Sequence, residues 1–356
     1  MDDKQQNTEE SIVVDGLRKS YGDVDALRGI DFGVRSGEIV GFLGPNGAGK
    51  TTTMKILTGF MAATDGHARV AGFDVHRQSD EVRKKIGYLP ENVPLYDEML
   101  VYDYLRFIAE VQEVKRAHRD ERIDAVAELT GIDAVMGRTI CELSKGYRQR
   151  VGLAQAIIHE PEVIILDEPT TGLDPNQIVE IRDVITTIGQ EKTIIFSTHI
   201  MQEVTAVCDR IIIIDDGELV ADGTLDELEE KALEATPGVM VSFEGGDEED
   251  LRNYLEGLGA VTGVVDVSGR QKTHKFRLLS DDISELRKAI IDGESRTPRG
   301  LLSLRAAEPT LEEIFRLYTA KNDDEHVDEE VDGEEEISAE AVDCQPVEKP
   351  EEVAGE

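Results

Sequence analysis

The sequence predicts an α/β fold built on a largely parallel sheet, and three observations indicate it. Short apolar runs without alternation recur along the chain, as expected for strands buried on both faces. These runs are Ile39–Leu43, Val163–Leu166, Thr193–Phe196 and Ile211–Ile214. Helical stretches lie between them, and the first run leads directly into a glycine-rich loop. Strands and helices that alternate in this way form a parallel sheet covered by helices.

The glycine-rich loop fits the spacing G-x-x-x-x-G-K-[ST] of a phosphate-binding loop. Glycines let successive N–H groups turn toward phosphate oxygens, Lys50 can reach the β- and γ-phosphates, and the Thr51 hydroxyl can ligate Mg²⁺. Glu38–Leu43 is expected to form the preceding strand and Thr52–Thr58 the following helix, whose N-terminus favours anions. The predicted nucleotide triphosphate site comprises Gly44, Pro45, Asn46, Gly47, Ala48, Gly49, Lys50, Thr51 and Thr52.

The apolar run Val163–Leu166 ends in two carboxylates, Asp167 and Glu168. Adjacent side chains of a strand point in different directions. We therefore expect Asp167 to bind Mg²⁺, directly or through water, and Glu168 to face the attacking water as a general base. Acidic residues at the end of a strand are common on protein surfaces, so the prediction depends on the pair occurring together with Lys50 and Thr51.

A second candidate phosphate contact lies 23 residues before Asp167, in the stretch Leu143–Arg150. Ser144 is predicted to cap the helix that follows it. The exposed N–H groups of such a helix start, together with the Ser144 hydroxyl, suit a γ-phosphate. On the local sequence alone, a plain N-cap is the simpler interpretation.

Composition excludes several classes of partner. The chain has 356 residues and a net charge of −37, which argues against nucleic acid and anionic lipid as partners. Cys141, Cys208 and Cys344 are isolated, so no zinc motif is indicated and a reducing cytosol is expected. Met1–Glu10 is polar and acidic, and no apolar run approaches the roughly 18–20 residues of a membrane span. We expect a soluble chain that reaches a membrane only through another protein.

Acidic residues are spread over the whole chain, Trp is absent, and Arg outnumbers Lys by 23 to 15. This composition favours a salt-adapted (halophilic) cytoplasm, in which high ionic strength screens self-repulsion. An ordinary acidic protein is the alternative.

The chain is expected to contain three parts: a nucleotide-binding domain over 11–235, a small domain over 236–320, and a tail over 321–356. In the second part, strands are predicted at Val239–Phe243, Ala260–Val267, His274–Leu278 and Leu301–Arg305, and helices at Glu248–Leu258, Ile283–Ile291 and Thr310–Tyr318. The strand pair is joined by a turn at Ser268–Arg270. The order β-α-β-β-α-β resembles a ferredoxin-like α+β domain. Residues 322–356 hold 16 Asp/Glu against one Lys, so the tail is predicted to be disordered.

Together these motifs resemble the ATP-binding subunit of an ABC transporter over about residues 11–225. The resemblance makes Gly44–Thr51 the Walker A loop and Val163–Glu168 the Walker B strand, in an ABC-type P-loop NTPase domain that uses ATP and Mg²⁺. It assigns the remaining roles as follows: Ser144, Lys145 and Gly146 form the signature motif, Asp174 lies in the D-loop, His199 is the switch histidine, and Tyr21 stacks on adenine.

The sequence departs from the family pattern at two places. The signature has Lys145 for Gly and Tyr147 for Gln, which some exporter-like members share. Glu91 stands where the Q-loop Gln is usual. Its carboxylate is expected either to bind Mg²⁺ more tightly than Gln does or to disturb the charge balance of the metal site. The stretch Pro309–Phe315 resembles the ending of exporter-type subunits whose permease is a separate chain.

The resemblance implies a head-to-tail pair of ATP-binding subunits on the cytoplasmic face of the cell membrane. ATP closes the pair, and hydrolysis reopens it. The movement is expected to reach a separate multi-span permease through the segment Glu91–Leu105, with export as the expected direction of transport. The alternative is a soluble ABC-type ATPase of assembly, repair or translation, which usually has tandem domains or coiled-coil insertions. A non-hydrolysing regulatory subunit is a third class, which Glu168 and His199 argue against.

Overall fold

The structure is a computed structural model, and it describes residues 10–198, 200–235, 238–266, 273–280, 282–296, 300–306 and 311–319. The described residues divide into two compact units, one formed by 10–91 with the described part of 160–319 and the other by 92–159. No helix of the described residues has both the length and the apolar character needed to cross a membrane. The predicted turn Ser268–Arg270 and the predicted acidic tail lie outside the described residues.

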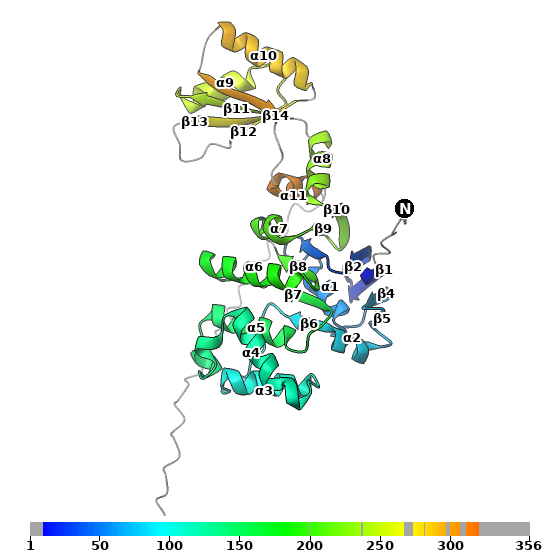
Figure 1. The fold of residues 1–356 in the computed structure, drawn as a ribbon. Helices are drawn as coiled ribbons and strands as arrows, with labels where there is room; N and C mark the ends of the chain where they lie inside the picture. Colours follow the sequence, from blue (N-terminus) through cyan, green and yellow to red (C-terminus); the bar gives the residue numbers. More distant parts are fainter. Residues whose placement is uncertain are drawn as a thin grey trace, which may run out of the picture. The chain divides into compact units, whose positions relative to one another are not determined.

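A six-stranded sheet forms the centre of the first unit (Figure 1). Its order is β10-β9-β3-β8-β7-β6, and all neighbours are parallel except the antiparallel edge strand β10. The strands are β3 (Ile39–Leu43), β6 (Ile86–Leu89), β7 (Val163–Asp167), β8 (Thr193–Thr198), β9 (Arg210–Asp215) and β10 (Glu218–Gly223). Every residue of β3, β7 and β8 is buried. The largely parallel sheet expected from the apolar runs is confirmed.

Helices connect the parallel strands, because a parallel pair needs a crossover. They are α1 (Lys50–Leu57), α2 (Ser79–Lys85), α6 (Pro175–Gly189) and α7 (Met201–Val207). The carboxyl ends of β3, β7 and β8 meet at one edge of the sheet, where Leu43 pairs with Thr198 and Asp167 with Ser197. This edge carries the candidate site.

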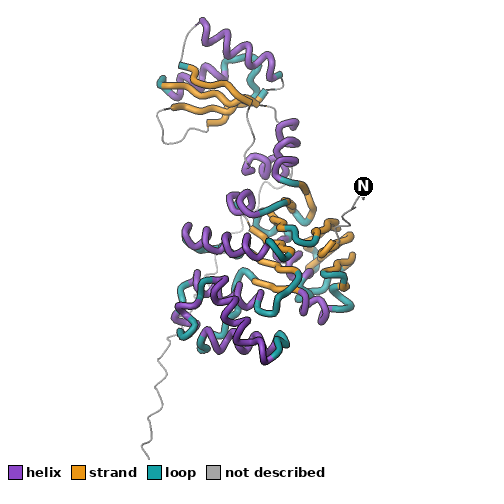
Figure 2. Tube along the Cα trace, viewed as in Figure 1, coloured by secondary structure: helices purple, strands orange, loops and turns teal. Residues whose placement is uncertain are grey.

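The first unit also contains an antiparallel sheet that the sequence analysis did not foresee. Its order is β2-β1-β4-β5, formed by β1 (Glu10–Tyr21), β2 (Val24–Arg35), β4 (Asp65–Val70) and β5 (Phe73–Asp74). Apolar side chains of one face, such as Ile12 and Val14, share a hydrophobic core with Val40 and Ile212 of the central sheet. The orange strands of Figure 2 show both sheets.

The second unit is helical. Its elements are α3 (Val101–Val111), α4 (Arg119–Thr130) and α5 (Lys145–Ile157), with 3-10 turns at Arg116–His118, Asp133–Val135 and Ile140–Glu142. The buried Tyr104 of α3 donates a hydrogen bond from its hydroxyl to Gln155 of α5. Arg148 lies 2.6 Å from the carboxylate of Asp97. These polar contacts fix the position of α5 within this unit.

Residues 238–306 form a separate hydrophobic core. The elements follow the order β11 (Gly238–Glu244), α9 (Glu248–Glu256), β12 (Gly263–Asp266), β13 (Thr273–Leu279), α10 (Ile283–Arg296) and β14 (Leu301–Ala306). They build an antiparallel sheet of order β12-β13-β11-β14. Val241, Phe243 and Phe276 pack against Leu251 of α9 and Leu286 of α10. The strand and helix positions agree with the expected segments to within a few residues.

Two further helices pack on the central sheet, α8 (Leu225–Ala235) and α11 (Leu311–Thr319). Leu228 of α8 and Ile314 of α11 are fully buried in one cluster with Leu43, Val204 and Ile213. The apolar core on this side of the central sheet therefore includes a helix that follows residues 238–306 in sequence.

Candidate functional site

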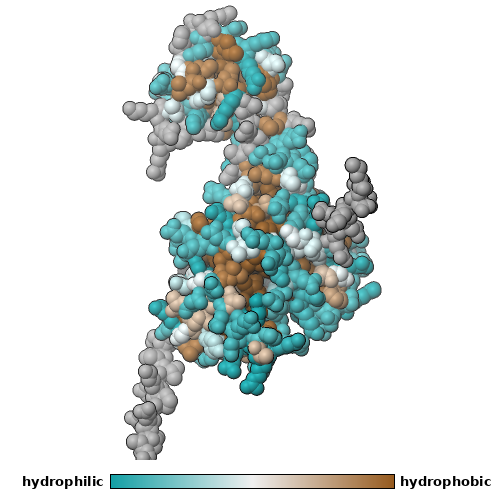
Figure 3. Space-filling model, in the orientation of Figure 1, coloured by the Kyte–Doolittle hydropathy of each residue, from teal (hydrophilic) through white to brown (hydrophobic). Residues whose placement is uncertain are grey.

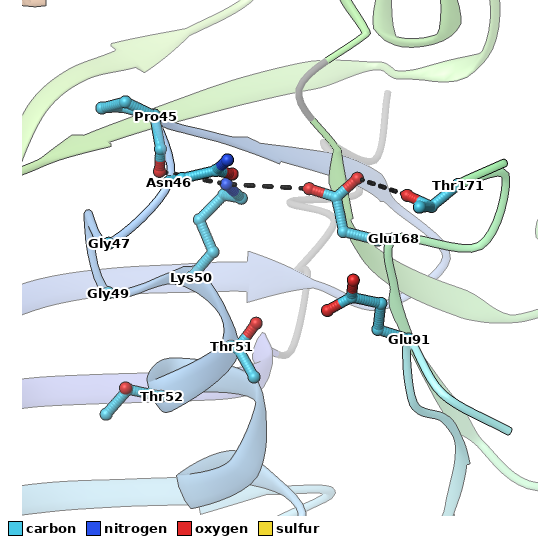
Figure 4. Close-up of a pocket in the computed structure, with 10 residues that line it drawn as sticks. All are labelled: Pro45, Asn46, Gly47, Gly49, Lys50, Thr51, Thr52, Glu91, Glu168 and Thr171. Carbon is cyan, nitrogen blue, oxygen red and sulfur yellow. Dashed lines mark hydrogen bonds and ion pairs between the residues drawn. The ribbon is translucent and has the colours of Figure 1, made fainter. Parts of the chain in front are cut away.

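The loop after β3 and the first turn of α1 line a pocket of about 470 Å³ (Figure 4). Its lining comprises Pro45, Asn46, Gly47, Gly49, Lys50, Thr51, Thr52, Glu91, Glu168 and Thr171. Gly49 has φ +109°, and a Cβ there would lie 2.8 Å from the Ala26 carbonyl oxygen. At Gly44 a Cβ would lie 2.4 Å from the Ile214 carbonyl oxygen. Glycine is therefore sterically required at both positions.

Lys50 is 6 % exposed, and its ammonium group contacts backbone and side-chain oxygens around the glycine-rich loop. Its ammonium donates to the carbonyl oxygens of Gly44, at 2.8 Å, and Pro45, at 3.2 Å. The same nitrogen lies 3.7 Å from Glu168 Oε1 (Figure 4). A buried cation fixed in this way at the start of a helix attracts phosphate oxygens.

Thr51 and Asp167 come together from α1 and β7, as predicted for a metal site. The Thr51 hydroxyl donates to Asp167 Oδ1 at 3.2 Å. Neighbouring oxygens around an octahedral Mg²⁺ ion lie about 3 Å apart, because each lies about 2.1 Å from the metal. The two oxygens therefore fit adjacent positions in the coordination sphere of Mg²⁺.

The buried position of Asp167 shifts the pKa of its carboxyl group. Burial raises the pKa of Asp167, hydrogen bonds from Ser197 and Thr51 lower it, and the neighbouring Glu168 raises it; the net shift is upward. A carboxylate that is disfavoured as an anion gains from a nearby cation. The predicted role of Asp167 as a metal ligand stays a prediction.

Glu168 lies immediately after β7 with φ +50°, a left-handed conformation that is uncommon for a residue other than glycine. Its backbone N–H donates to both the carbonyl oxygen and the hydroxyl of Ser197, at 3.1 and 3.0 Å. Its carboxylate accepts a hydrogen bond from the Thr171 hydroxyl at 3.2 Å. These contacts hold the carboxylate toward the pocket, where a general base must lie.

Two residues in this arrangement were not predicted to have a role in the site. Ser197 also donates its hydroxyl proton to Asp167 Oδ1 at 2.6 Å, so one side chain contacts both acidic residues. Thr171 lies three residues after Glu168 and lines the pocket. The pairing of β7 with β8 brings Ser197 to this place, which no local pattern indicates.

Other predicted site residues lie outside the pocket lining. Tyr21 is 46 % exposed, and its hydroxyl donates to the Met61 sulfur at 2.8 Å. Asp174 caps α6 by accepting from the N–H groups of Asn176 and Gln177. Their predicted roles stay predictions.

The residues expected to form the signature motif lie in the second unit. Ser144 caps α5, accepting from the Tyr147 N–H at 3.5 Å, and Lys145 and Gly146 form the first turn. The cap agrees with the sequence, whereas the proposed phosphate contact of these residues stays a prediction. His199 lies outside the described residues.

Comparison with known proteins gives consistent results. A family model described as ABC transporter matches residues 27–171. An uncharacterized ABC transporter ATP-binding protein of Synechocystis sp. is 35% identical over 82% of this chain and 78% of its own length. A daunorubicin resistance ATP-binding protein of Streptomyces coeruleorubidus is 33% identical over 90% of this chain and 98% of its own. A solved ATP-binding subunit of an ABC transporter superposes with a TM-score of 0.58 and 29% identity, covering 62% of this chain and 92% of that one.

Proposed function

The chain belongs to the ABC transporter family as an ATP-binding protein, an ABC-type ATPase, and we propose that it hydrolyses ATP to drive export through a separate membrane permease. The observation that carries the proposal is the pocket, in which Lys50, Thr51, Asp167 and Glu168 meet around a glycine loop. The daunorubicin-resistance relative supports export as the direction.

Each residue of the pocket has a distinct role in the proposed hydrolysis of ATP. The loop N–H groups and Lys50 hold the β- and γ-phosphates of ATP, and Glu168 takes a proton from the attacking water. Thr51 and Asp167 would hold Mg²⁺, with Glu91 of the pocket lining as a further oxygen ligand. Bound Mg²⁺ supplies positive charge to the phosphate oxygens in the transition state. Tyr21 stacks on the adenine, and His199 contacts the γ-phosphate.

A second copy of an ATP-binding subunit completes the proposed site. Ser144, Lys145 and Gly146 of the partner would contact the γ-phosphate from the opposite side, and Asp174 lies in the loop between the two sites. The N-terminus of α5, which follows the Ser144 cap, supports this role because helix N-termini bind anions. A head-to-tail pair related by two-fold symmetry then contains two ATP sites.

The helical unit offers a docking surface for the permease on α3 and the segment before it. Tyr96, Leu100, Phe107 and Val111 are 41–58 % exposed, although they are large and apolar. The rings of Tyr96 and Phe107 are in contact, with centroids 5.7 Å apart. Exposed apolar groups of this kind mark a protein interface. We propose that this surface holds the subunit at the membrane, on the cytoplasmic face that the family resemblance implies. The net charge of −37 argues against nucleic acid among its partners.

Residues 238–306 are proposed to be a ferredoxin-like accessory domain, since their element order and sheet order are those of that fold. Their separate apolar core supports a domain that is stable by itself. Limited proteolysis should release a resistant fragment of this span. Cleavage within β11 or β13 as rapid as in the linkers would contradict the proposal.

Replacement of the base tests the function most directly. Glu168→Gln should reduce turnover by two orders of magnitude or more while ATP is still bound, because general bases contribute roughly 10²–10⁴-fold. The variant should form an ATP-dependent dimer on size exclusion, and Lys50→Ala should not, because it loses a phosphate contact. Hydrolysis near the wild-type rate in Glu168→Gln would overturn the assignment of the base.

The proposed interaction with a membrane permease can be tested with native membranes. A tagged chain should co-purify with a multi-span protein, and Phe107→Ser should abolish the complex while leaving basal ATPase activity unchanged. Association with ribosomes in the soluble fraction would favour the alternative, a soluble ABC-type ATPase in assembly, repair or translation.

A further inference from the structure

The turn between β9 and β10 contacts the phosphate-binding loop, although the proposed mechanism gives this turn no role. Asp216 and Gly217 form the turn, with φ +45° and +76°. Two successive positive φ values are typical of hairpin turns that match the twist of antiparallel strands, and Asp-Gly is a preferred sequence for them. The hairpin therefore explains these two residue types, but it does not explain the contacts that they make outside the hairpin.

Gly217 connects the phosphate-binding loop to β2. Its N–H donates to the Ala48 carbonyl oxygen at 3.1 Å, and its carbonyl oxygen accepts from the Arg28 N–H at 2.9 Å. The Arg28 guanidinium also lies 2.6 Å from the Asp216 carboxylate. A Cβ at Gly217 would lie 3.0 Å from the Ala26 carbonyl oxygen, so the turn lies close against β2. Two hydrogen bonds and one ion pair thus join the turn, β2 and the loop.

The hydrogen bond to Ala48 acts on a peptide group at the pocket. The Ala48 carbonyl and the Gly49 N–H belong to one planar trans peptide unit, in which these two groups point in opposite directions. Ala48 is 3 % exposed, whereas Gly49 lines the pocket. Because Gly217 holds the carbonyl on its own side of the loop, the Gly49 N–H is directed away from the turn.

We propose that Arg28 and Asp216 are positioning residues, whose ion pair holds the turn against Ala48 and so keeps the Gly49 N–H oriented toward a phosphate oxygen. The inference rests on the proposed binding of ATP phosphates by the loop. Neither the arginine nor the aspartate side chain has to touch ATP for this role. A loop that is already held in its binding conformation loses less entropy when the ligand binds, so the expected gain is in affinity.

Calorimetric titration with ATP and with inorganic tripolyphosphate, both without Mg²⁺, gives the first test. Arg28→Met removes the cation, and Asp216→Asn removes the anion but keeps a residue that tolerates positive φ. Each variant should raise both dissociation constants about two- to fivefold, because a partly exposed ion pair contributes modestly. Arg28→Lys keeps a cation and should bind both ligands within about 1.5-fold of the wild type.

Steady-state kinetics with Mg²⁺ distinguish binding from chemistry. In Arg28→Met and Asp216→Asn, KM for ATP should rise by the factor seen in the titrations, and kcat should stay within about twofold, since only binding is lost. A fall in kcat at an unchanged KM would contradict a role in phosphate binding and overturn the inference.

Tripolyphosphate separates the loop from the base contact, because Arg28 follows the hairpin that carries Tyr21. If ATP bound more weakly while tripolyphosphate bound as before, Arg28 would act on the base, and the inference would be wrong. Salt provides a second check. At 1 M KCl, where the screening length is about 3 Å, the affinities of Arg28→Met and the wild type should converge. A ratio that stays constant would show that the loss does not come from the ion pair.

Asp222 provides a matched control on the same two strands. Its two carboxylate oxygens accept from Arg210 at 2.5 Å, and this pair lies at the end of the β9–β10 hairpin remote from the turn. Asp222→Asn should lower the melting temperature at least as much as Asp216→Asn, yet leave both dissociation constants unchanged. Equal losses of affinity in the two variants would show an effect of general hairpin stability, which overturns the inference.

Lys50→Ala separates the inference from the function on which it depends. If the loop binds phosphate, this variant should bind tripolyphosphate about tenfold or more weakly, because a charged hydrogen bond is lost. An unchanged affinity would overturn the proposed phosphate site, and the inference with it. A loss in Lys50→Ala, together with wild-type affinities in Arg28→Met and Asp216→Asn, would overturn the positioning role alone.

Discussion

At the scale of single residues, the buried carboxylate of Asp167 is expected to lower the stability of the fold at neutral pH. Burial raises the pKa of Asp167 above its unfolded value, in spite of the hydrogen bonds from Ser197 and Thr51. The stabilisation that protonated Asp167 gives is present below the unfolded pKa and is lost as the pH rises through the folded pKa. At neutral pH the buried anion therefore destabilises the fold.

Asp167→Asn should consequently raise the melting temperature at pH 7 without Mg²⁺, while abolishing hydrolysis. A gain of a few degrees is expected, since about 1 kcal/mol corresponds to about 2–4 °C in a domain of this size. The gain should shrink as the pH falls toward 4, where the wild-type carboxyl becomes protonated. Thermal unfolding followed by circular dichroism between pH 4 and 8 measures both effects.

Asp74 provides a control, because the pKa of its carboxyl group is shifted in the direction opposite to that of Asp167. Backbone hydrogen bonds from Arg77 and His76 lower its pKa, so its stabilisation is present above the unfolded pKa and is lost as the pH falls. Asp74→Asn should therefore lower the melting temperature at pH 7. If Asp167→Asn destabilised the protein in the same way at pH 7, its buried charge would not be the cause of the cost.

At the scale of elements, continuous apolar runs were informative and alternating ones were not. Ile39–Leu43 and Val163–Leu166 became fully buried strands because helices cover both faces of the parallel sheet. Glu10–Tyr21 mixes polar and apolar residues, since one face meets the core and the other is partly exposed. The irregular register of β1 with β2 interrupts the alternation further, so the antiparallel sheet was not predicted.

Local sequence motifs likewise identified some residues of the candidate site but not those that the fold brings there. Lys50, Thr51 and Glu168 belong to contiguous motifs whose chemistry can be stated from the sequence alone, and the structure places all three at one pocket. Ser197 reaches Asp167 only because β8 pairs with β7. A serine near a strand end carries no pattern that distinguishes it from a surface residue.

At the scale of the whole molecule, charge is the dominant property. The face in Figure 3 is mostly hydrophilic, and the net charge is −37. Residues 322–356 hold 16 acidic residues and one Lys, which is −15, so −22 remains on residues 1–321. Closure of the proposed dimer would bring two such bodies together around ATP, which is itself anionic. Lys50, Arg148 and Arg150 offset this repulsion only locally.

Salt should therefore strengthen both folding and ATP-driven dimerisation up to molar concentrations. The screening length falls from about 10 Å at 0.1 M to about 3 Å at 1 M, which removes long-range repulsion between the acidic surfaces. The affinity of an ordinary site for ATP would instead fall, because salt also screens Lys50 from phosphate.

The melting temperature and the dimer fraction of Glu168→Gln should be measured from 0.1 to 3 M KCl, with the same series repeated after deletion of 322–356. We expect both quantities to rise with salt in each protein, because −22 remains after the deletion. Maxima at low salt would exclude a salt-adapted protein and require another reason for the acidity.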